Sequence, residues 1–118
     1  MLQVFGIKNC NTVKKAVDWL KENKKEYTFN DYKKTPVTKD KLIAWNEKIS
    51  WEKLINKKGT TWRKLSLEDQ EKVVDFNSAA ALIMQNNSLL RRPLIEAHNE
   101  LIVGFDEQEY MTKFKDNR

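Results

Sequence analysis

The segment that decides the fold prediction is LQVFGIKNCNTVKKAVDWLKENKKEYTFNDY, residues 2–32. Apolar and polar residues alternate over 2–6, and this alternation predicts a short strand. From Thr12 onwards apolar residues recur at helical spacing, which predicts a helix that ends near Asn23. Aromatic and polar residues alternate over 27–32 and predict a second strand. The order strand, helix, strand predicts two parallel strands joined by a right-handed crossover.

The middle of the chain has the spacing of helices. Thr38 is a candidate N-cap for an amphipathic helix that runs towards Trp51. Ser66 opens a stretch that resembles a capping box, and the weakly apolar segment from there to Phe76 is predicted to be helical. A further short helix is expected to begin at Ser78 as its N-cap. The sequence therefore predicts a block of helices after the first two strands.

The last part of the chain returns to strand patterns. Residues 94–97 and 100–104 are predicted to pair as a hairpin around a two-residue polar turn. Asp106 is a candidate N-cap for a final helix, with Glu109 three residues on. Strands that bracket helices in this order predict an α/β fold, with a mixed four-stranded sheet and helices packed on it.

The length and composition limit the class of protein. A chain of 118 residues, of which 40% are hydrophobic, is expected to form one domain over 1–118. It contains no run of about 20 apolar residues, which a membrane-spanning helix requires. The opening MLQVFGIKNC lacks the pattern of a signal peptide, and the mean hydropathy is −0.74. A cytoplasmic location is expected.

The net charge of +5 is unevenly distributed. Residues 1–65 carry 16 lysines and arginines against 7 acidic residues, whereas residues 66–118 carry 6 against 10. A basic face is a candidate for binding nucleic acid or an acidic protein. We favour the interpretation that these lysines lie on the solvated faces of helices, because no nucleic-acid-binding motif accompanies them. Direct nucleic-acid binding is not predicted.

The single cysteine and the single histidine exclude an internal disulfide and a metal site built from several such residues. The histidine, His98, falls in the predicted hairpin turn and is expected to be exposed and uninvolved. Of the four tryptophans, at least three are expected to pack in the core. Trp62 falls in a predicted loop, where lining a cleft is the alternative to core packing.

The cysteine lies where thiol chemistry is favoured. Cys10 falls between the first strand and the first helix, beside Asn11 and Thr12. Free N–H groups and the helix dipole at that position stabilise a thiolate, and Lys8 would add a positive charge. The alternative is an inert cysteine that serves as a small apolar residue. A C-x-x-C disulfide is excluded because Val13 occupies the place of the second cysteine.

The second informative stretch is Arg91-Arg92-Pro93. A proline at the start of a strand is a candidate for a cis peptide bond. The two arginines would hold an oxyanion or the carboxylate of a thiol ligand through their paired N–H donors. The alternative is a pair of surface arginines that form salt bridges with acidic residues.

Four segments together resemble the ArsC-like family, and they are most similar to its YffB-like branch, which is related to arsenate reductases and to Spx-type transcriptional regulators. The segments, in chain order, are Gly6-Ile7-Lys8-Asn9-Cys10-Asn11-Thr12, Gly59-Thr60-Thr61-Trp62-Arg63-Lys64-Leu65, Arg91-Arg92-Pro93 and Val103-Gly104-Phe105-Asp106. The resemblance covers about residues 2–115 and implies a thioredoxin-like fold with a helical insertion at about 38–87. It also implies that Cys10 is the nucleophile, Arg92 an active-site arginine and Pro93 the cis-proline.

The chain departs from the family pattern at two positions. Glutathione- and glutaredoxin-linked arsenate reductases carry arginines where this chain has Asn56 and Gly104. Arg63 is a candidate substitute for one of them, although it stands at a different place in the sequence. The departures predict that arsenate is a poor substrate.

The resemblance implies a thiol-dependent reductase in which one cysteine is resolved by an external thiol. Glutathione or another low-molecular-weight thiol is the expected co-substrate, and a glutaredoxin-like protein is an expected partner. Two alternatives stay open: a Spx-like regulator that binds the RNA polymerase alpha subunit, and a true arsenate reductase. The residues predicted to bind the substrate are Lys8, Asn11, Thr12, Arg63, Arg91 and Pro93.

Overall fold

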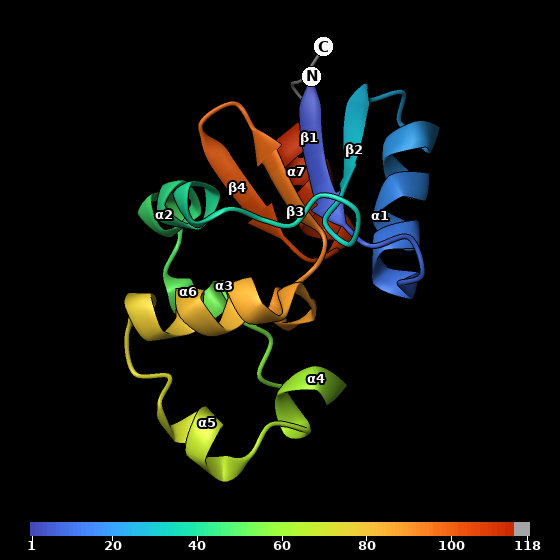
Figure 1. The fold of residues 1–118 in the computed structure, drawn as a ribbon. Coiled ribbons are helices and arrows are strands. Elements are labelled where there is room, and N and C mark those ends of the chain that lie inside the picture. Colours follow the sequence, from blue (N-terminus) through green and yellow to red (C-terminus); the bar gives the residue numbers. More distant parts are fainter. Residues whose placement is uncertain (115–118) are drawn as a thin grey trace. The chain divides into compact units, whose positions relative to one another are not determined.

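The computed structural model describes residues 1–114 of the chain (Figure 1). These residues divide into two compact units. The sheet unit comprises 1–31 and, within the described residues, 92–114, while the helical unit comprises 32–91. The predicted insertion at 38–87 falls inside the helical unit, and the assignment of the chain to one domain stays a prediction.

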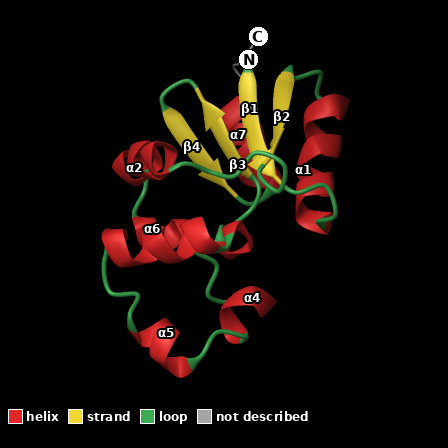
Figure 2. Cartoon of the chain, viewed as in Figure 1, coloured by secondary structure: helices red, strands yellow, loops and turns green. Residues whose placement is uncertain are grey.

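The sheet unit contains a mixed four-stranded sheet in the order β2-β1-β3-β4 (Figure 2). Its strands are β1 (Leu2–Gly6), β2 (Tyr27–Asp31), β3 (Leu94–Ala97) and β4 (Glu100–Val103). β1 and β2 are parallel, as the crossover predicted, whereas β3 is antiparallel to both β1 and β4. The predicted mixed sheet and hairpin are therefore confirmed.

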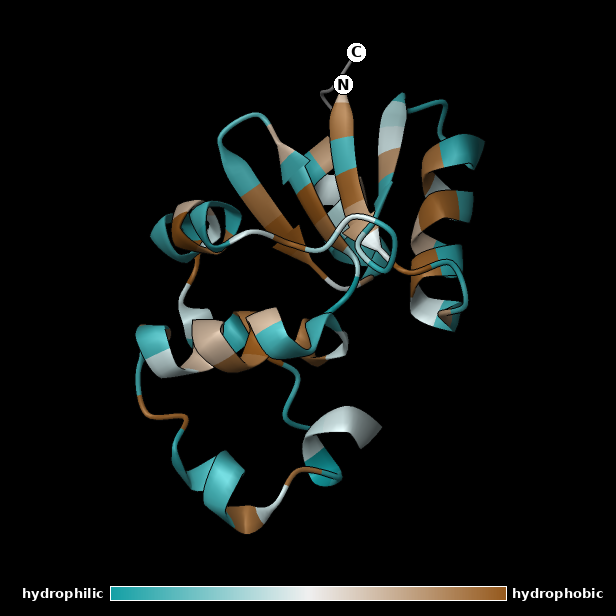
Figure 3. Cartoon of the chain, viewed as in Figure 1, coloured by the Kyte–Doolittle hydropathy of each residue, from teal (hydrophilic) through white to brown (hydrophobic). Residues whose placement is uncertain are grey.

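Two helices share one face of this sheet: α1 (Asn11–Glu22) and α7 (Glu107–Phe114). Val4 pairs with Ile95 in register, and Ile95 with Ile102, so these side chains lie on the same face. They form one buried core with Ala16, Trp19 and Leu20 of α1 and Tyr110 and Phe114 of α7. Figure 3 shows the apolar stripe of α1 and the alternating strands that supply this core.

The helical unit consists of helices of three to ten residues. They are α2 (Lys39–Lys48), α3 (Trp51–Leu54), α4 (Thr60–Arg63), α5 (Leu67–Glu71), α6 (Phe76–Gln85) and the 3-10 helix η1 (Asn87–Leu89). In all of them except α4, the N-cap side chain accepts a hydrogen bond from a backbone N–H. The hydroxyl of Thr38 accepts a hydrogen bond from the N–H of Lys41, which confirms the predicted N-cap. The hydroxyl of Ser66 accepts one from the N–H of Asp69 in the same way.

The helix predicted from Ser66 to Phe76 begins where expected but ends early, at Glu71, and the predicted cap at Ser78 is wrong. The N-cap of α6 is Asp75, whose carboxylate accepts a hydrogen bond from the N–H of Ser78 while the Ser78 hydroxyl accepts one from the N–H of Asp75. This reciprocal capping box holds Asp75 in the extended conformation, with φ −152° and ψ −179°. A residue in that conformation cannot continue a helix, so no single helix runs from Ser66 to Phe76; α5 ends at Glu71.

The predictions for the tryptophans are also corrected. Trp62 lies in α4 and not in a loop, because the carbonyl of Gly59 accepts a hydrogen bond from the N–H of Arg63. Trp19 and Trp45 are buried, whereas Trp51 and Trp62 are half-buried. Lys57 lies beside both half-buried rings, with its Nζ 6.0 Å and 5.3 Å from the ring centroids of Trp51 and Trp62.

No helix among residues 1–114 is long and apolar enough to cross a membrane.

Candidate active site around Cys10

Cys10 is the N-cap residue of α1. Its backbone is extended, with φ −126° and ψ 123°, and its carbonyl accepts the first helical hydrogen bond, from the N–H of Lys14 at 2.9 Å. The side chain is half-buried, as predicted for a residue at a junction between loop and helix. The first turn of α1 contains no acidic residue that would compete for its free N–H groups.

The surroundings of Cys10 favour the thiolate. Burial of the thiol raises its pKa, but hydrogen bonds from the Val13 N–H, the Arg92 side chain and the Thr12 N–H, together with the charge of Arg92, outweigh that effect. The pKa of Cys10 therefore lies below its ordinary value. The neutral thiol is a weak acceptor and forms no side-chain cap hydrogen bond at the start of α1, so these N–H groups act mainly on the charged sulfur. The donors are thus placed to favour the charged form.

Arg92 provides the positive charge that we had expected from Lys8. Lys8 is exposed and is not among the described groups that lower the pKa of Cys10. Arg92 is half-buried and lies directly before Pro93, and the peptide bond between them is cis, as predicted. The structure thus brings together the cysteine and the arginine from opposite ends of the sequence.

The segment around Pro93 is tied to the turn after β4. The carbonyl of Pro93 accepts a hydrogen bond from the N–H of Gly104 at 2.8 Å. Gly104 has φ +79°, a conformation that L side chains rarely adopt, and its carbonyl accepts a hydrogen bond from the Tyr110 hydroxyl at 2.6 Å. Burial of Tyr110 raises the pKa of its phenol, which keeps that hydroxyl a donor. The hydrogen bond from Gly104 therefore holds the backbone at Pro93, the residue directly after Arg92.

A second close approach positions the loop that carries Cys10. A Cβ atom on Gly6, at the end of β1, would lie 3.0 Å from Cγ2 of Val13. The absence of a side chain at Gly6 lets the first turn of α1 pack closely against the strand. The N–H groups of that turn are thereby held beside the thiol.

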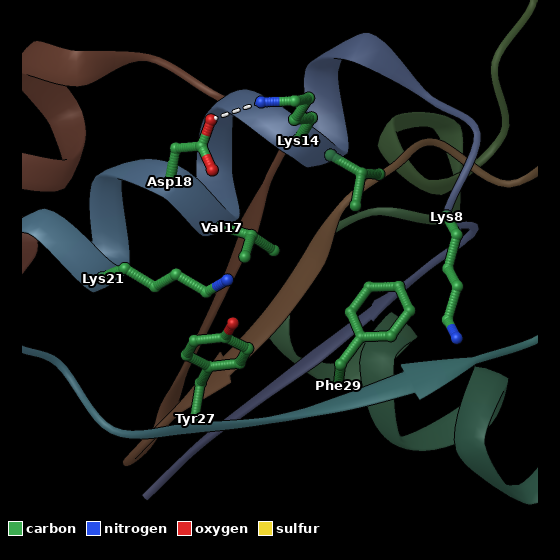
Figure 4. Close-up of a pocket in the computed structure, with 8 residues that line it drawn as sticks. Lys8, Lys14, Val17, Asp18, Lys21, Tyr27 and Phe29 are labelled. Atoms are coloured by element: carbon green, nitrogen blue, oxygen red, sulfur yellow. Dashed lines mark hydrogen bonds and ion pairs between the residues drawn. The ribbon is translucent and has the colours of Figure 1, made fainter.

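The other predicted substrate-binding residues have different surroundings. Asn11 and Thr12 are the exposed first residues of α1, and Lys8 lies at one end of a pocket along α1 (Figure 4). Arg63 and Arg91 are exposed residues of the helical unit, and the N–H of Arg91 donates to the carbonyl of Leu54. Their part in the site stays a prediction.

The two positions where family arginines are missing have local roles. The side-chain oxygen of Asn56 accepts a hydrogen bond from the N–H of Lys58 at 3.1 Å, which holds the loop before α4. At Gly104 the left-handed backbone disfavours an arginine. Asn56 therefore stabilises its loop, and Gly104 permits the left-handed backbone of its turn.

Metal binding finds no support among residues 1–114, which contain no cluster of three or more histidine, cysteine, aspartate or glutamate side chains placed to hold an ion. His98 is exposed in the hairpin turn with φ +52°. It is not among the described groups that shift the pKa of Cys10, and its lack of a role stays a prediction.

The N–H of Val13 lowers the pKa of Cys10 and was not identified as a donor from the sequence. Val13 was interpreted only as an apolar residue that excludes a C-x-x-C motif. With Cys10 at the N-cap, however, Thr12 and Val13 stand at the second and third helical positions, whose N–H groups face the cap side chain. Locating the cap would have identified both donors.

The chain is similar to known proteins along nearly its whole length. Residues 5–113 match the ArsC family. An uncharacterized protein of Haemophilus influenzae is 36% identical over 114 residues, which cover 97% of this chain and 99% of that protein. The global transcriptional regulator Spx of Streptococcus pyogenes serotype M1 is 27% identical over 112 residues, 92% of this chain and 81% of the regulator.

Solved structures extend the similarity to the fold. A protein named YFFB has a TM-score of 0.89 and 34% identity, with 95% of this chain and 97% of that chain covered. An arsenate reductase (ArsC) related protein from Brucella melitensis has a TM-score of 0.76 and 39% identity, with 97% and 94% covered. The expected thioredoxin-like α/β fold of the ArsC type is thereby confirmed.

Proposed function

The chain belongs to the ArsC family, and from this premise we propose that it is a thiol-dependent reductase in which Cys10 is the nucleophile. The observation that carries the proposal is the lowered pKa of Cys10, which results from the N–H groups of Val13 and Thr12 and from Arg92. A thiolate is the attacking form of cysteine, and a half-buried position leaves its sulfur accessible.

The proposed substrate is a mixed disulfide between a protein and a low-molecular-weight thiol. The Cys10 thiolate attacks the sulfur of the small thiol, a new S–S bond forms, and the protein sulfur leaves as a thiolate that takes a proton from water. The substrate disulfide has then been reduced at one sulfur, and Cys10 carries the small thiol as a mixed disulfide.

A second thiol must complete the cycle, because Cys10 is the one cysteine of the chain. The thiolate of a second small thiol, glutathione or another of its class, attacks the small-thiol sulfur bound to Cys10. The bond to Cys10 breaks, the Cys10 thiolate is restored, and the small thiol leaves as its symmetrical disulfide. A glutaredoxin-like protein is the alternative donor of that attacking thiolate.

Arg92 has two roles in this proposal. Its hydrogen bond and charge stabilise the Cys10 thiolate both as nucleophile and as leaving group. Its N–H donors also orient a carboxylate of the small thiol, with help from the free N–H groups at the start of α1. Lys8, Asn11 and Thr12 are the further substrate-binding residues that we propose on this side of Cys10.

Arsenate is proposed to be a poor substrate. Asn56 and Gly104 replace two arginines that the family's arsenate reductases use to hold an oxyanion. A charge-assisted hydrogen bond contributes about 1.5–3 kcal/mol, so losing two such anchors weakens arsenate binding by orders of magnitude.

The test is turnover of a glutathione-mixed disulfide on a reporter peptide, compared with arsenate reduction under the same supply of glutathione and glutaredoxin. We expect disulfide turnover by the wild-type chain, none by Cys10→Ser, and a reduced rate for Arg92→Ala that Arg92→Lys partly restores. Lys15→Gln, an exposed change on α1, is the matched control and should keep the wild-type rate. Efficient arsenate turnover that survives Arg92→Ala would contradict both the substrate preference and the role of Arg92.

A regulator that binds the RNA polymerase alpha subunit is the second candidate. The similarity to the transcriptional regulator Spx, over 92% of this chain, favours it. The discriminating experiment is a pull-down with the C-terminal domain of the alpha subunit. Tight binding without turnover of either substrate would favour the regulator over the reductase.

A further inference from the structure

An open groove lies between α1 and β2 in the sheet unit (Figure 4). Its volume is about 470 Å³, which lies in the range of ligand-binding pockets. We call it the α1 groove, and the residues that line it are Lys8, Val13, Lys14, Val17, Asp18, Lys21, Tyr27 and Phe29.

Two cations that line the α1 groove have no acidic partner among residues 1–114. Lys14 and Asp18 form an exposed ion pair at 2.9 Å, so their charges offset each other. Neither Lys8 nor Lys21 forms an ion pair or a side-chain hydrogen bond with another residue of 1–114. Figure 4 shows these two lysines at opposite ends of the groove. The groove therefore presents a positive charge at each end.

The floor between the two lysines is apolar. Val17, Tyr27 and Phe29 are half-buried, and the two aromatic residues lie on the same face of β2, where they pack against the core of the sheet unit. β2 is an edge strand in the order β2-β1-β3-β4. An edge strand beside an apolar groove is a surface that extended peptides use for binding.

We propose that the α1 groove binds an extended acidic segment of a partner protein, with the pattern acidic–x–apolar–x–acidic. The part of the groove that α1 lines extends from Val13 to Lys21, eight residues or about 12 Å along the helix, and Lys8 lies before α1 at the opposite end from Lys21. In an extended segment the first and fifth residues lie about 13 Å apart, and the first, third and fifth side chains share one face. The two acidic side chains then reach Lys8 and Lys21, while the apolar one contacts Val17, Tyr27 and Phe29.

This inference goes beyond the proposed reductase activity. The groove adjoins Cys10 through Lys8 and Val13, but nothing in the proposed binding requires the thiol. Cys10→Ser should therefore abolish disulfide turnover and leave binding in the groove unchanged. Failure of one proposal does not imply failure of the other.

The test uses acetyl-Asp-Ser-Phe-Ser-Asp amide and the ¹⁵N-labelled full chain in two-dimensional NMR. We expect saturable shift changes in α1 and β2 that weaken between 50 and 500 mM salt. Two control peptides are acetyl-Asn-Ser-Phe-Ser-Asn amide, which lacks the charges, and acetyl-Ser-Asp-Phe-Asp-Ser amide, which turns the acidic side chains to the other face. Both should bind at least fivefold more weakly than the first peptide.

Variants of the chain locate the site. Lys8→Gln and Lys21→Gln should each weaken binding about two- to fivefold, as expected for exposed ion pairs. Lys15→Gln removes a lysine of α1 that does not line the groove and should leave the affinity unchanged. All three positions are exposed, so each variant is expected to fold.

Three results would overturn the proposal. The first is equal binding of the two acidic peptides, and the second is equal loss of affinity in Lys15→Gln and Lys21→Gln. The third is binding of isophthalate, a small dianion, as tightly as the peptide, which would make the occupant a small organic anion.

Discussion

The two units of the chain are stabilised in different ways. In the sheet unit, strands and two helices bury one continuous apolar core, and the rings of Trp19, Phe105, Tyr110 and Phe114 meet at centroid distances of 4.9–5.9 Å. In the helical unit, side chains such as Trp45, Leu54 and Leu89 are also buried, but they come from several short helices. Two of these helices, α3 and α5, have only four and five residues, and each begins at a serine whose hydroxyl accepts a backbone hydrogen bond. The unit also exposes the large apolar side chains of Ile43, Leu67, Val74 and Met84.

This difference indicates where precise chemistry is possible. Cys10 and Arg92 belong to the unit with the continuous core, so their backbones are held by strands and by close contacts such as Gly6 against Val13. Short helices that depend on caps open at lower free energy than a packed sheet. We therefore expect the loss of stability to depend on whether a substitution removes core packing, a backbone constraint or a helix cap.

The largest effect is expected for Leu20→Ala in α1. Leu20 is fully buried in the core of the sheet unit, so the substitution removes apolar contacts and leaves a cavity. The free energy of unfolding should fall by about 2–5 kcal/mol in a denaturant titration. Leu67→Ala, the same change at a residue of α5 that is 70% exposed, should alter it by less than about 0.5 kcal/mol. Equal losses would contradict the comparison.

A smaller effect is expected for Gly104→Ala. Open space surrounds this position, so an added methyl group meets no clash, but the residue must keep φ at +79°. That conformation costs an L residue about 1–2 kcal/mol, which should appear as a lower thermal midpoint. His98 also has a positive φ, +52°, so His98→Gly should leave the thermal midpoint unchanged or raise it. A destabilised His98→Gly variant would argue against backbone strain as the cause.

In the helical unit, Ser78→Ala should have a smaller effect still. The Ser78 hydroxyl accepts hydrogen bonds from the N–H groups of Val74 and Asp75, and removing it disrupts the capping box of α6. We expect a loss of about 0.5–1 kcal/mol. Asn77→Ala, on the same turn, raises helix propensity as Ser78→Ala does but removes no cap, so it should cost nothing. A comparable loss there would contradict the cap as the cause.

The smallest effect on stability is expected for Arg92→Ala, whose consequence is a change in pH dependence. The midpoint of Cys10 alkylation against pH should lie below that of a free thiol in the wild type and should rise in this variant. The folded pKa is depressed, so the thiolate stabilises the fold above the unfolded pKa, and this contribution is lost as pH falls through the folded pKa. Arg92→Lys should give an intermediate midpoint. An unchanged midpoint in Arg92→Ala would show that Arg92 does not lower the pKa of Cys10.

The agreement between prediction and structure follows the same division of the chain. The strands over 2–6 and 94–97 and the first helix were predicted within a residue or so, because one buried face imposes a clear period on the sequence. In the region 66–78 the cap at Ser66 is confirmed, but the length of the helix and the cap of the next one were predicted wrongly, since both Ser78 and Asp75 are good capping residues. Only the observed hydrogen bonds distinguish the cap from its partner at the third helical position.

The sequence by itself determined the βαβ start, the hairpin, the single cysteine at a helix start and the arginine before a proline, because these depend on local periodicity and residue type. The tertiary structure decided which cation acts on the thiol. Lys8 is two residues from Cys10 along the chain, yet Arg92, more than 80 residues away, lowers the thiol pKa. Pairing of β1 with β3 brings the two segments together, and electrostatic interaction depends on distance in space rather than on separation in sequence.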